Sequence, residues 1–111
     1  MIYNLKESNK NEISEILKKY DKINIIYYYS NYCIFCNLFK PLWNKIKTKY
    51  KKNIKVNIIN VEYGDFGHLK SKYKRNVRGF PTIIKYNNKK KREYKGSKSF
   101  KDLTEFIKKI I

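Results

Sequence analysis

The sequence predicts an α/β fold in which a central mixed sheet is flanked by helices. Apolar runs rich in Ile, Val and Tyr alternate along the chain with segments whose apolar residues recur at helical spacing. Early strands separated by helices imply right-handed parallel crossovers, whereas the last two strands are joined by a short turn and form an antiparallel hairpin. The chain has 111 residues, enough for one compact domain, and we assign residues 1–111 to it.

The first half of the chain is expected to supply three strands and two helices. Residues 2–5 form a short edge strand, and residues 13–20 form a helix with apolar side chains at i, i+3, i+4 and i+7. The continuous apolar run at residues 24–29 predicts a buried central strand. Helical spacing continues through residues 39–50, and a second buried strand is expected over residues 54–61.

The second half is expected to fold as a short helix, two strands and a last helix, at residues 69–73, 82–86, 91–94 and 99–110. Asn87 and Asn88 are turn residues, which joins the two strands as a hairpin. Ser99 can cap the last helix, with Asp102 three residues later. Helical spacing places Ile110 on the buried face of that helix.

The net charge is +18, and its origin has two explanations. Lys, Asn, Ile and Tyr have AT-rich codons, so we favour codon drift in an AT-rich genome such as that of a large DNA virus or a protist. A selected basic surface would instead attract nucleic acid or acidic proteins. The lysines lie on every predicted element, and no nucleic-acid-binding signature accompanies them.

The predicted compartment follows from the ends and the apolar segments. No stretch is long and apolar enough to cross a membrane, and the first residues turn polar at once, so we expect neither a signal peptide nor membrane attachment. A cytoplasmic location follows, or packaging in a virion if the protein is viral. Cysteines in a reducing compartment are more often catalytic or metal-binding than structural.

The two cysteines, Cys33 and Cys36, carry the candidate chemistry. Two thiols at this spacing, after a strand and at the start of a helix, are placed to exchange electrons as a dithiol/disulfide pair. Unpaired N–H groups at a helix start lower the pKa of a thiol, so we expect Cys33 to be the attacking nucleophile. Cys36 lies one turn deeper and is expected to be shielded and to resolve the mixed disulfide.

The same residues allow other interpretations. A structural zinc site needs four ligands, and only His68 remains to help the cysteines, so we expect no metal, although the cysteine pairs of two chains in a dimer would together supply four ligands. Two buried, inert cysteines would also fit the spacing. The tyrosines at residues 27–29 could stack on bases, but core packing is the better explanation, with Tyr27 and Tyr29 on one face of a strand and Tyr28 on the other.

A second motif makes the sequence resemble the thioredoxin family. Residues 77–82, Val-Arg-Gly-Phe-Pro-Thr, resemble the loop that carries a cis-proline facing the disulfide in thioredoxins and in the catalytic domains of protein disulfide isomerases. The order of the elements, the position of Cys-x-x-Cys after the second strand, and Pro41 in what would be the kinked active-site helix also match the family. The end of the chain, from Glu93 to Gly96 and onward, resembles the isomerase type.

The resemblance implies a thioredoxin fold and a thiol–disulfide oxidoreductase. Its substrates would be protein thiols and disulfides, exchanged through a mixed disulfide on Cys33. Tyr32, Phe80 and Pro81 would contact substrate, and backbone beside Pro81 would pair with an extended substrate strand. No bound cofactor is implied; electrons would come from or go to a recycling dithiol system. We expect a monomer.

Three departures from the family pattern bear on function. Tyr32 replaces a usual Trp, and Ile34-Phe35 replace the usual Gly-Pro or Gly-His between the cysteines. Neither Ile34 nor Phe35 can stabilise a thiolate by charge, which favours a reductase-like potential. Tyr27 stands where the family usually buries a carboxylate that helps move the proton of the second cysteine.

Two further points stay open at the level of sequence. Lys40 and Lys98 are candidates for electrostatic tuning of the thiols, although a solvated lysine is the default. A non-catalytic module of the same fold, with a basic surface for nucleic acid or acidic partners, is the alternative function.

Overall fold

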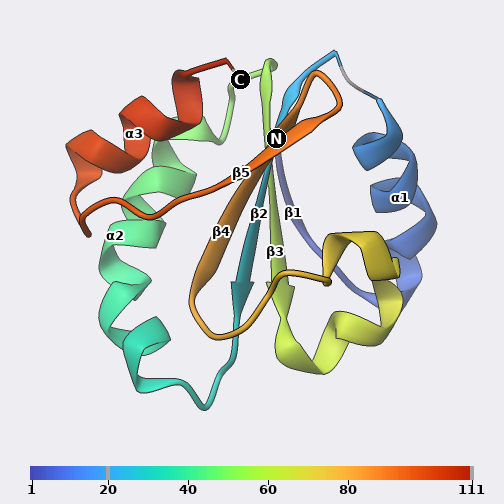
Figure 1. Cartoon of the computed structure of the whole chain (residues 1–111), viewed down its shortest axis with the longest axis horizontal. Helices are drawn as coiled ribbons and strands as arrows, with labels where there is room; N and C mark the ends of the chain where they lie inside the picture. The colour runs from blue at the N-terminus through green and yellow to red at the C-terminus, as the bar shows by residue number, and fades with distance from the viewer. Residues whose placement is uncertain (20, 111) are drawn as a thin grey trace.

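The structure, a computed structural model, describes residues 1–19 and 21–110, and within them five strands form one mixed sheet (Figure 1). The strands are β1 (Ile2–Asn4), β2 (Ile23–Tyr29), β3 (Val56–Glu62), β4 (Thr82–Asn87) and β5 (Lys90–Glu93). They lie in the order β1-β3-β2-β4-β5. β3 runs parallel to both β1 and β2, and β4 runs antiparallel to both β2 and β5. The predicted α/β fold with a mixed sheet is therefore confirmed.

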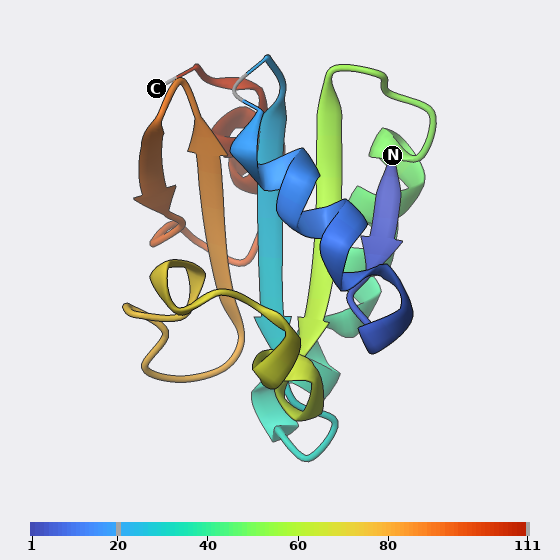
Figure 2. The ribbon, with the colours of Figure 1, turned by 90° about the vertical axis from the view of Figure 1, so that its right-hand side faces the viewer.

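Helices cover both faces of the sheet (Figure 1). α2 (Ile34–Tyr50) and α3 (Phe100–Lys108) lie on one face. α1 (Lys10–Lys18) crosses the other face, as Figure 2 shows, together with the short 3-10 helices η2 (Tyr63–His68) and η3 (Ser71–Tyr73). A further 3-10 turn, η1 (Glu7–Asn9), leads into α1. Within the described residues, no helix combines the length and the apolar character needed to span a bilayer.

Each face of the sheet has its own core because successive side chains of a strand point to opposite faces. Between the sheet and α2 and α3 the buried residues include Tyr27, Phe39 and Trp43. Between the sheet and α1 they include Tyr28 and Tyr73. Tyr29 packs with Tyr27, so the predicted division of the three tyrosines between the two faces is confirmed.

The register of the central strands brings the two sequence motifs to one end of the sheet. β2 pairs with β4 so that Tyr28 lies opposite Thr82. The chain leaves β2 one residue later, toward Cys33, and it enters β4 directly after Pro81. A slip of this register by one residue would turn every side chain of the strand to the other face. The burial pattern therefore fixes the register, and with it the closeness of the two motifs.

Several element boundaries differ from the sequence prediction. The strand predicted from residue 54 begins at Val56, and Ile54 is exposed before it. The polar stretch at residues 62–68, for which the sequence predicted no helix or strand, contains the 3-10 helix η2. In the β4–β5 hairpin the turn residues are Asn88 and Lys89, which have positive φ angles of 53° and 62°. Such angles suit a tight hairpin turn, and Asn87 instead ends β4.

The helix ends show what the apolar pattern could and could not predict. Ser99 caps α3 by accepting a hydrogen bond from the Asp102 N–H, as its sequence position indicated. Ile110 was expected in the core, but α3 ends at Lys108 and Ile110 is exposed. α1 ends at Lys18, and Tyr20, assigned to its buried face, lies outside the described residues.

One lysine is buried at the end of α3. Lys85, on β4, is 1% exposed, and its amine donates to the backbone carbonyls of Phe106 and Lys109. Its Nζ lies 4.5 Å from the centroid of the Phe106 ring. Burial, followed by repulsion from Arg92 and Lys109, lowers the pKa of Lys85 to about 8. A neutral amine keeps two hydrogens, so both carbonyls can be satisfied without the charge.

We predict that Lys85 makes the protein more stable as pH rises. Its pKa is about 8 when folded and 10.5 when free, so between these values the unfolded chain binds one more proton than the folded chain and the free energy of unfolding increases with pH. Urea unfolding between about pH 7 and pH 10 should show this gain relative to Lys85→Met, which cannot titrate. Lys90→Met, on exposed β5, is the control and should follow the unmodified protein. An identical pH dependence in all three proteins would contradict the prediction.

Candidate functional site

The first cysteine lies where α2 begins. Cys33 is the N-cap residue of the helix, with extended φ and ψ angles of −99° and 117°. Its Sγ accepts a hydrogen bond from the Cys36 backbone N–H at 3.3 Å, and its carbonyl accepts from the Asn37 N–H at 3.1 Å. The thiol thus occupies the place of a capping oxygen, where the N–H groups of a helix start favour negative charge.

The two thiols differ in exposure and in acidity. Both are free; Cys33 is half-buried and Cys36 is buried. A hydrogen bond from the Cys36 side chain, followed by backbone N–H groups of Cys36 and Phe35 and the charge of Lys98, lowers the pKa of Cys33. Burial, followed by the hydrogen bond with Cys33, raises the pKa of Cys36 to about 11. Cys33 is therefore the thiol that ionises first.

Lys98 is the lysine whose charge acts on both thiols. It lies in the loop before α3, and its Nζ is 5.5 Å from the centroid of the Phe35 ring. Its positive charge lowers the pKa of both cysteines. Lys40, the other lysine suggested by the sequence, instead lines a cavity beneath Cys36. The structure therefore favours Lys98 over Lys40 as the lysine that lowers the pKa of the thiols.

The Pro81 loop lies directly against Cys33. The Phe80–Pro81 peptide bond is cis. The Cys33 thiol lies 3.4 Å from the Phe80 carbonyl oxygen and donates a hydrogen bond to it. Phe80 also packs edge-on against Tyr63 and Phe66, with ring centroids 5.7 Å apart in both pairs. Phe80 and Pro81, predicted from their motif, thus lie beside the first cysteine.

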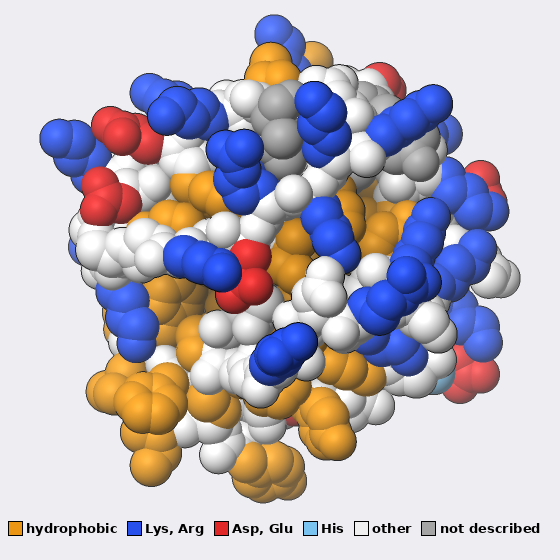
Figure 3. Space-filling model, viewed as in Figure 1, with side chains coloured by type: hydrophobic (Ala, Val, Ile, Leu, Met, Phe, Trp, Pro, Cys, Tyr) orange, Lys and Arg blue, Asp and Glu red, His pale blue; other side chains and the backbone are white. Residues whose placement is uncertain are grey.

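An apolar surface surrounds the thiols. Figure 3 shows hydrophobic side chains gathered at the end of the molecule where α2 begins, while Lys and Arg side chains cover much of the rest of that view. Tyr32, at 96% exposure, is the most open of these residues. The other exposed members near the start of α2 and η2 are Ile34, Phe35, Leu38 and Tyr63. Exposed apolar patches of this kind are typical of surfaces that bind another molecule.

A stack of aromatic rings fills the place beneath Cys36. The Tyr27 ring lies 4.4 Å from Trp43 and 5.3 Å from Tyr29, between centroids. Burial raises the pKa of Tyr27, and the negative charge of a Cys36 thiolate raises it further. A phenol held in this state cannot accept a proton near neutral pH. Tyr27 is thus a packing residue, with no base in the position that it occupies.

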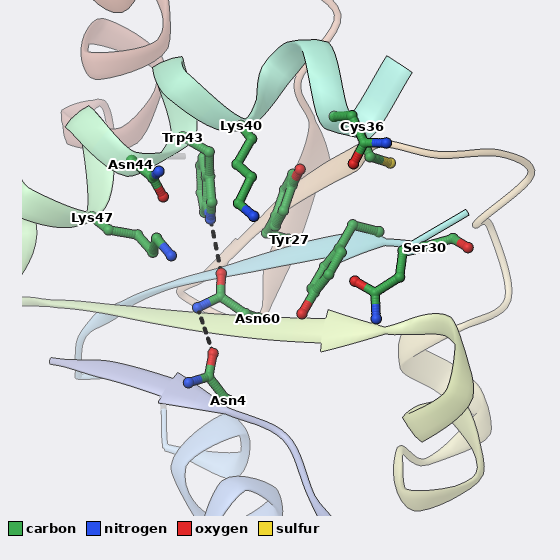
Figure 4. Close-up of a pocket in the computed structure, with 12 residues that line it drawn as sticks. Asn4, Tyr27, Ser30, Cys36, Lys40, Trp43, Asn44, Lys47 and Asn60 are labelled. Carbon is green, nitrogen blue, oxygen red and sulfur yellow. Dashed lines mark hydrogen bonds between the residues drawn. The ribbon is translucent and has the colours of Figure 1, made fainter. Parts of the chain in front are cut away.

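A polar cavity of about 150 Å³ adjoins this stack and reaches Cys36 (Figure 4). In Figure 4 the Lys40 side chain extends from α2 alongside the stacked rings of Trp43 and Tyr27. Across the cavity Trp43 Nε1 donates to Asn60 Oδ1 at 2.8 Å, and Asn60 Nδ2 donates to Asn4 Oδ1 at 3.1 Å. The space and its polar lining suit water that could carry a proton to or from Cys36.

Two parts of the site were not predicted from the sequence. The Glu62 carboxylate accepts hydrogen bonds from the Asn31 N–H at 3.1 Å and the Gly64 N–H at 2.7 Å, and so joins the loop after β2 to the start of η2. Tyr63 and Phe66 support Phe80, although they lie in a stretch that appeared polar. Only the aromatic residues within that stretch could have signalled this packing.

The remaining candidate, His68, has an acidic residue rather than a cysteine as its charged neighbour. It faces Asp65, with Nε2 and Oδ1 3.9 Å apart. Among the described residues, no three His, Cys, Asp or Glu side chains are grouped where they could hold a metal ion.

Comparisons with known proteins agree with this geometry. Residues 4–109 match the family model described as Thioredoxin. The chain is 26% identical over 91 residues to the thioredoxin domain-containing protein 5 homolog of Drosophila melanogaster, covering 80% of this chain and 22% of that protein. The chain therefore spans less than a quarter of the length of this relative.

Solved structures show the same fold. The first thioredoxin domain of mouse protein disulfide-isomerase A4 matches with a TM-score of 0.70 and 20% identity, over 94% of this chain and 71% of that one. The germline-specific thioredoxin Deadhead of Drosophila melanogaster matches with a TM-score of 0.71 and 17% identity, over 100% of both chains. Since the family model extends over almost the entire sequence, the chain belongs to the thioredoxin family.

Proposed function

We propose that this chain is a thiol–disulfide oxidoreductase that acts on protein substrates. The observation that carries the proposal is the opposite displacement of the two thiols: the pKa of Cys33 is lowered at the open start of α2, and that of buried Cys36 is raised. Thiolates attack disulfides, whereas a thiol that keeps its proton is a poor nucleophile. The pair is therefore suited to attack first with Cys33 and second with Cys36.

The proposed reaction has two displacement steps. The Cys33 thiolate attacks a substrate disulfide, forms a mixed disulfide and releases one substrate sulfur as a thiolate. Cys36 then gives up its proton and attacks Cys33 Sγ, which releases the second substrate sulfur and leaves a Cys33–Cys36 disulfide. The substrate gains two electrons, and a second dithiol, which is itself oxidised to a disulfide, must supply two more to reduce the Cys33–Cys36 disulfide again. With an oxidised pair and a dithiol substrate, the same steps run in reverse.

The surface around Cys33 supports a protein as the substrate. Tyr32, Phe35 and Phe80 lie around the thiols, and a flat apolar surface suits an unfolded or extended segment better than a small polar molecule. The alternative, a non-catalytic module with a basic surface, would need neither the difference in acidity nor this surface. Trapping experiments separate the two functions.

We predict distinct roles for the two cysteines. Alkylation of the reduced protein near neutral pH should label Cys33 first, because its pKa is the lower of the two. Cys36→Ser should attack a substrate but fail to resolve it, so that partners remain joined to Cys33 and can be purified from a lysate under non-reducing conditions. Cys33→Ser, and the variant with both serines, are the controls and should trap nothing. Trapping by Cys33→Ser alone would reverse the roles, and full insulin reductase activity in both single variants would exclude the proposed enzyme.

We predict that Lys98 increases the reactivity of Cys33. Its charge lowers the pKa of the Cys33 thiol, so Lys98→Met should move the pH profile of Cys33 alkylation to higher pH and slow alkylation near neutrality. Lys101→Met, at the start of α3, removes the same charge from a nearby exposed position and is the matched control. Rates of iodoacetamide labelling across the pH range measure both profiles. Equal shifts in both variants would show a general effect of net charge, and this would contradict a specific role for Lys98.

We predict that a carboxylate at residue 27 speeds the second step. In Tyr27→Glu, burial should raise the pKa of the new carboxyl group toward neutrality, which makes it a better proton acceptor for Cys36 than a phenol. The rate at which substrate is released from the mixed disulfide, measured by rapid mixing, should increase. Tyr27→Phe keeps the stacked ring without the hydroxyl and should leave this rate unchanged. The Glu variant should also unfold at lower urea concentration, because a polar group replaces a packed aromatic; an unchanged release rate in the folded Glu variant would contradict the prediction.

A further inference from the structure

β5 forms one free edge of the sheet. It is the last strand in the order β1-β3-β2-β4-β5, and all four of its residues are exposed. Figure 2 shows β5 on the outer side of β4, and no helix or strand of the described residues lies beyond it. An edge strand of this kind presents a row of backbone N–H and C=O groups that can pair with another chain.

The hydrogen-bond pattern shows which groups face outward. The Tyr94 N–H donates to the Ile83 carbonyl at 2.8 Å, across the β4–β5 pair. Residues of an antiparallel pair alternate between facing the partner strand and facing away from it. Arg92 therefore faces β4 with its backbone groups, while Lys91 and Glu93 direct theirs away from β4. The tight turn at Asn88 and Lys89 holds this edge in register.

Positive charge lines this edge on both faces of the sheet. Lys91 lies opposite Tyr86 and so shares the face of η3, whereas Arg92 lies opposite Lys85 and shares the face of α3. The effect of Arg92 and Lys109 on the pKa of Lys85 shows that cations on the α3 side are close enough to repel one another.

On the η3 side the edge borders a hollow of about 280 Å³. Its floor is apolar except for the buried Asn87, and its rim carries five basic residues and, among the described residues, no acidic one. The floor residues are Leu17, Tyr73 and Tyr86, and the rim residues are Lys72, Arg75, Lys89, Lys90 and Lys91. Basic residues are about a quarter of the chain but five of the nine that line the hollow, which is more than an even spread of lysine would give.

These features distinguish among possible partners. A second copy of this chain would bring like charges together at the edge, which disfavours self-pairing. Nucleic acid would neutralise the cations but would leave the outward N–H and C=O groups of Lys91 and Glu93 without strand partners. An extended acidic peptide satisfies both the backbone groups and the charges.

We propose that the free edge of β5 docks an extended acidic segment of another protein, which adds to the sheet as a strand. Its backbone pairs with the outward groups of Lys91 and Glu93, and its carboxylates meet basic side chains on both faces. An apolar side chain of the segment enters the hollow over Tyr73 and Tyr86. This docking site is separate from the cysteines and does not depend on the proposed disulfide exchange.

The test uses fluorescent peptides and the variant with Cys33→Ser and Cys36→Ser, in which no mixed disulfide can form. A peptide of repeated Glu-Glu-Val-Val places carboxylates and apolar side chains on both faces of a strand, and it should bind, as measured by anisotropy at low salt. A peptide of repeated Glu-Glu-Pro-Pro has the same charge but lacks N–H groups along both of its edges, and it should bind about tenfold more weakly. Equal binding of the two peptides would show attraction by charge alone and would overturn the proposal.

Glu93 separates the backbone contribution from the charge contribution. Glu93→Pro removes an outward N–H and also a negative charge, so pairing predicts weaker binding, by about tenfold, whereas charge alone predicts tighter binding. Glu93→Gln removes the charge but keeps the N–H, and it should bind the Glu-Glu-Val-Val peptide at least as tightly as the parent. Tighter binding by Glu93→Pro would overturn the proposal.

Hydrogen exchange keeps the test independent of the proline variant, should that variant fail to fold. Saturating Glu-Glu-Val-Val peptide should slow exchange of the Lys91 and Glu93 amides in the otherwise unmodified chain. An oligothymidylate strand at the same charge should leave these amides unprotected. Absence of peptide protection, or equal protection by the oligonucleotide, would overturn strand docking, and neither result would affect the trapping experiments on Cys33.

Discussion

The start of α2 at Cys33 is the constraint on which the site depends. Because Cys33 caps the helix, its Sγ accepts the Cys36 N–H, and the same first turn places Cys36 inside the molecule. One local structure therefore makes one thiol acidic and the other reluctant to ionise. The register between β2 and β4 then supplies the second half of the site by bringing Phe80 and Pro81 to the end of β2. The site therefore needs both the start of α2 and the Phe80–Pro81 loop.

Most of the fold could be predicted from the sequence because its elements have strong and different periodicities. The apolar runs of β2 and β3 are buried along their length, and their positions follow directly from composition. Errors appear at the ends of elements, because a single apolar residue does not determine where a helix or strand begins or ends. Ile110 continues the spacing of α3, yet the helix has already ended at Lys108. Ile54 is apolar but precedes the first paired residue of β3.

The site was partly predictable for a different reason. Cys33, Cys36 and Pro81 stand in short motifs, whereas the groups that support them are brought together only by tertiary structure. Glu62 caps η2 through the Gly64 N–H and also accepts from the Asn31 N–H, 31 residues away in the sequence, and no local spacing encodes this second contact. Lys98 is one of many lysines, and its distinction is its position over Phe35. The free edge at β5 likewise follows from strand order, which the sequence alone left open.

The contact between the Cys33 thiol and the Phe80 carbonyl has a consequence for timing. The donor in this hydrogen bond is the proton that Cys33 must lose before it can react. Once that proton leaves, an anionic sulfur faces an oxygen lone pair, and the carbonyl is released as an acceptor for an incoming backbone N–H. In the proposed exchange, a single deprotonation would thus activate the nucleophile and free the Phe80 carbonyl beside it to accept a substrate N–H, so that reactivity and binding would be coupled.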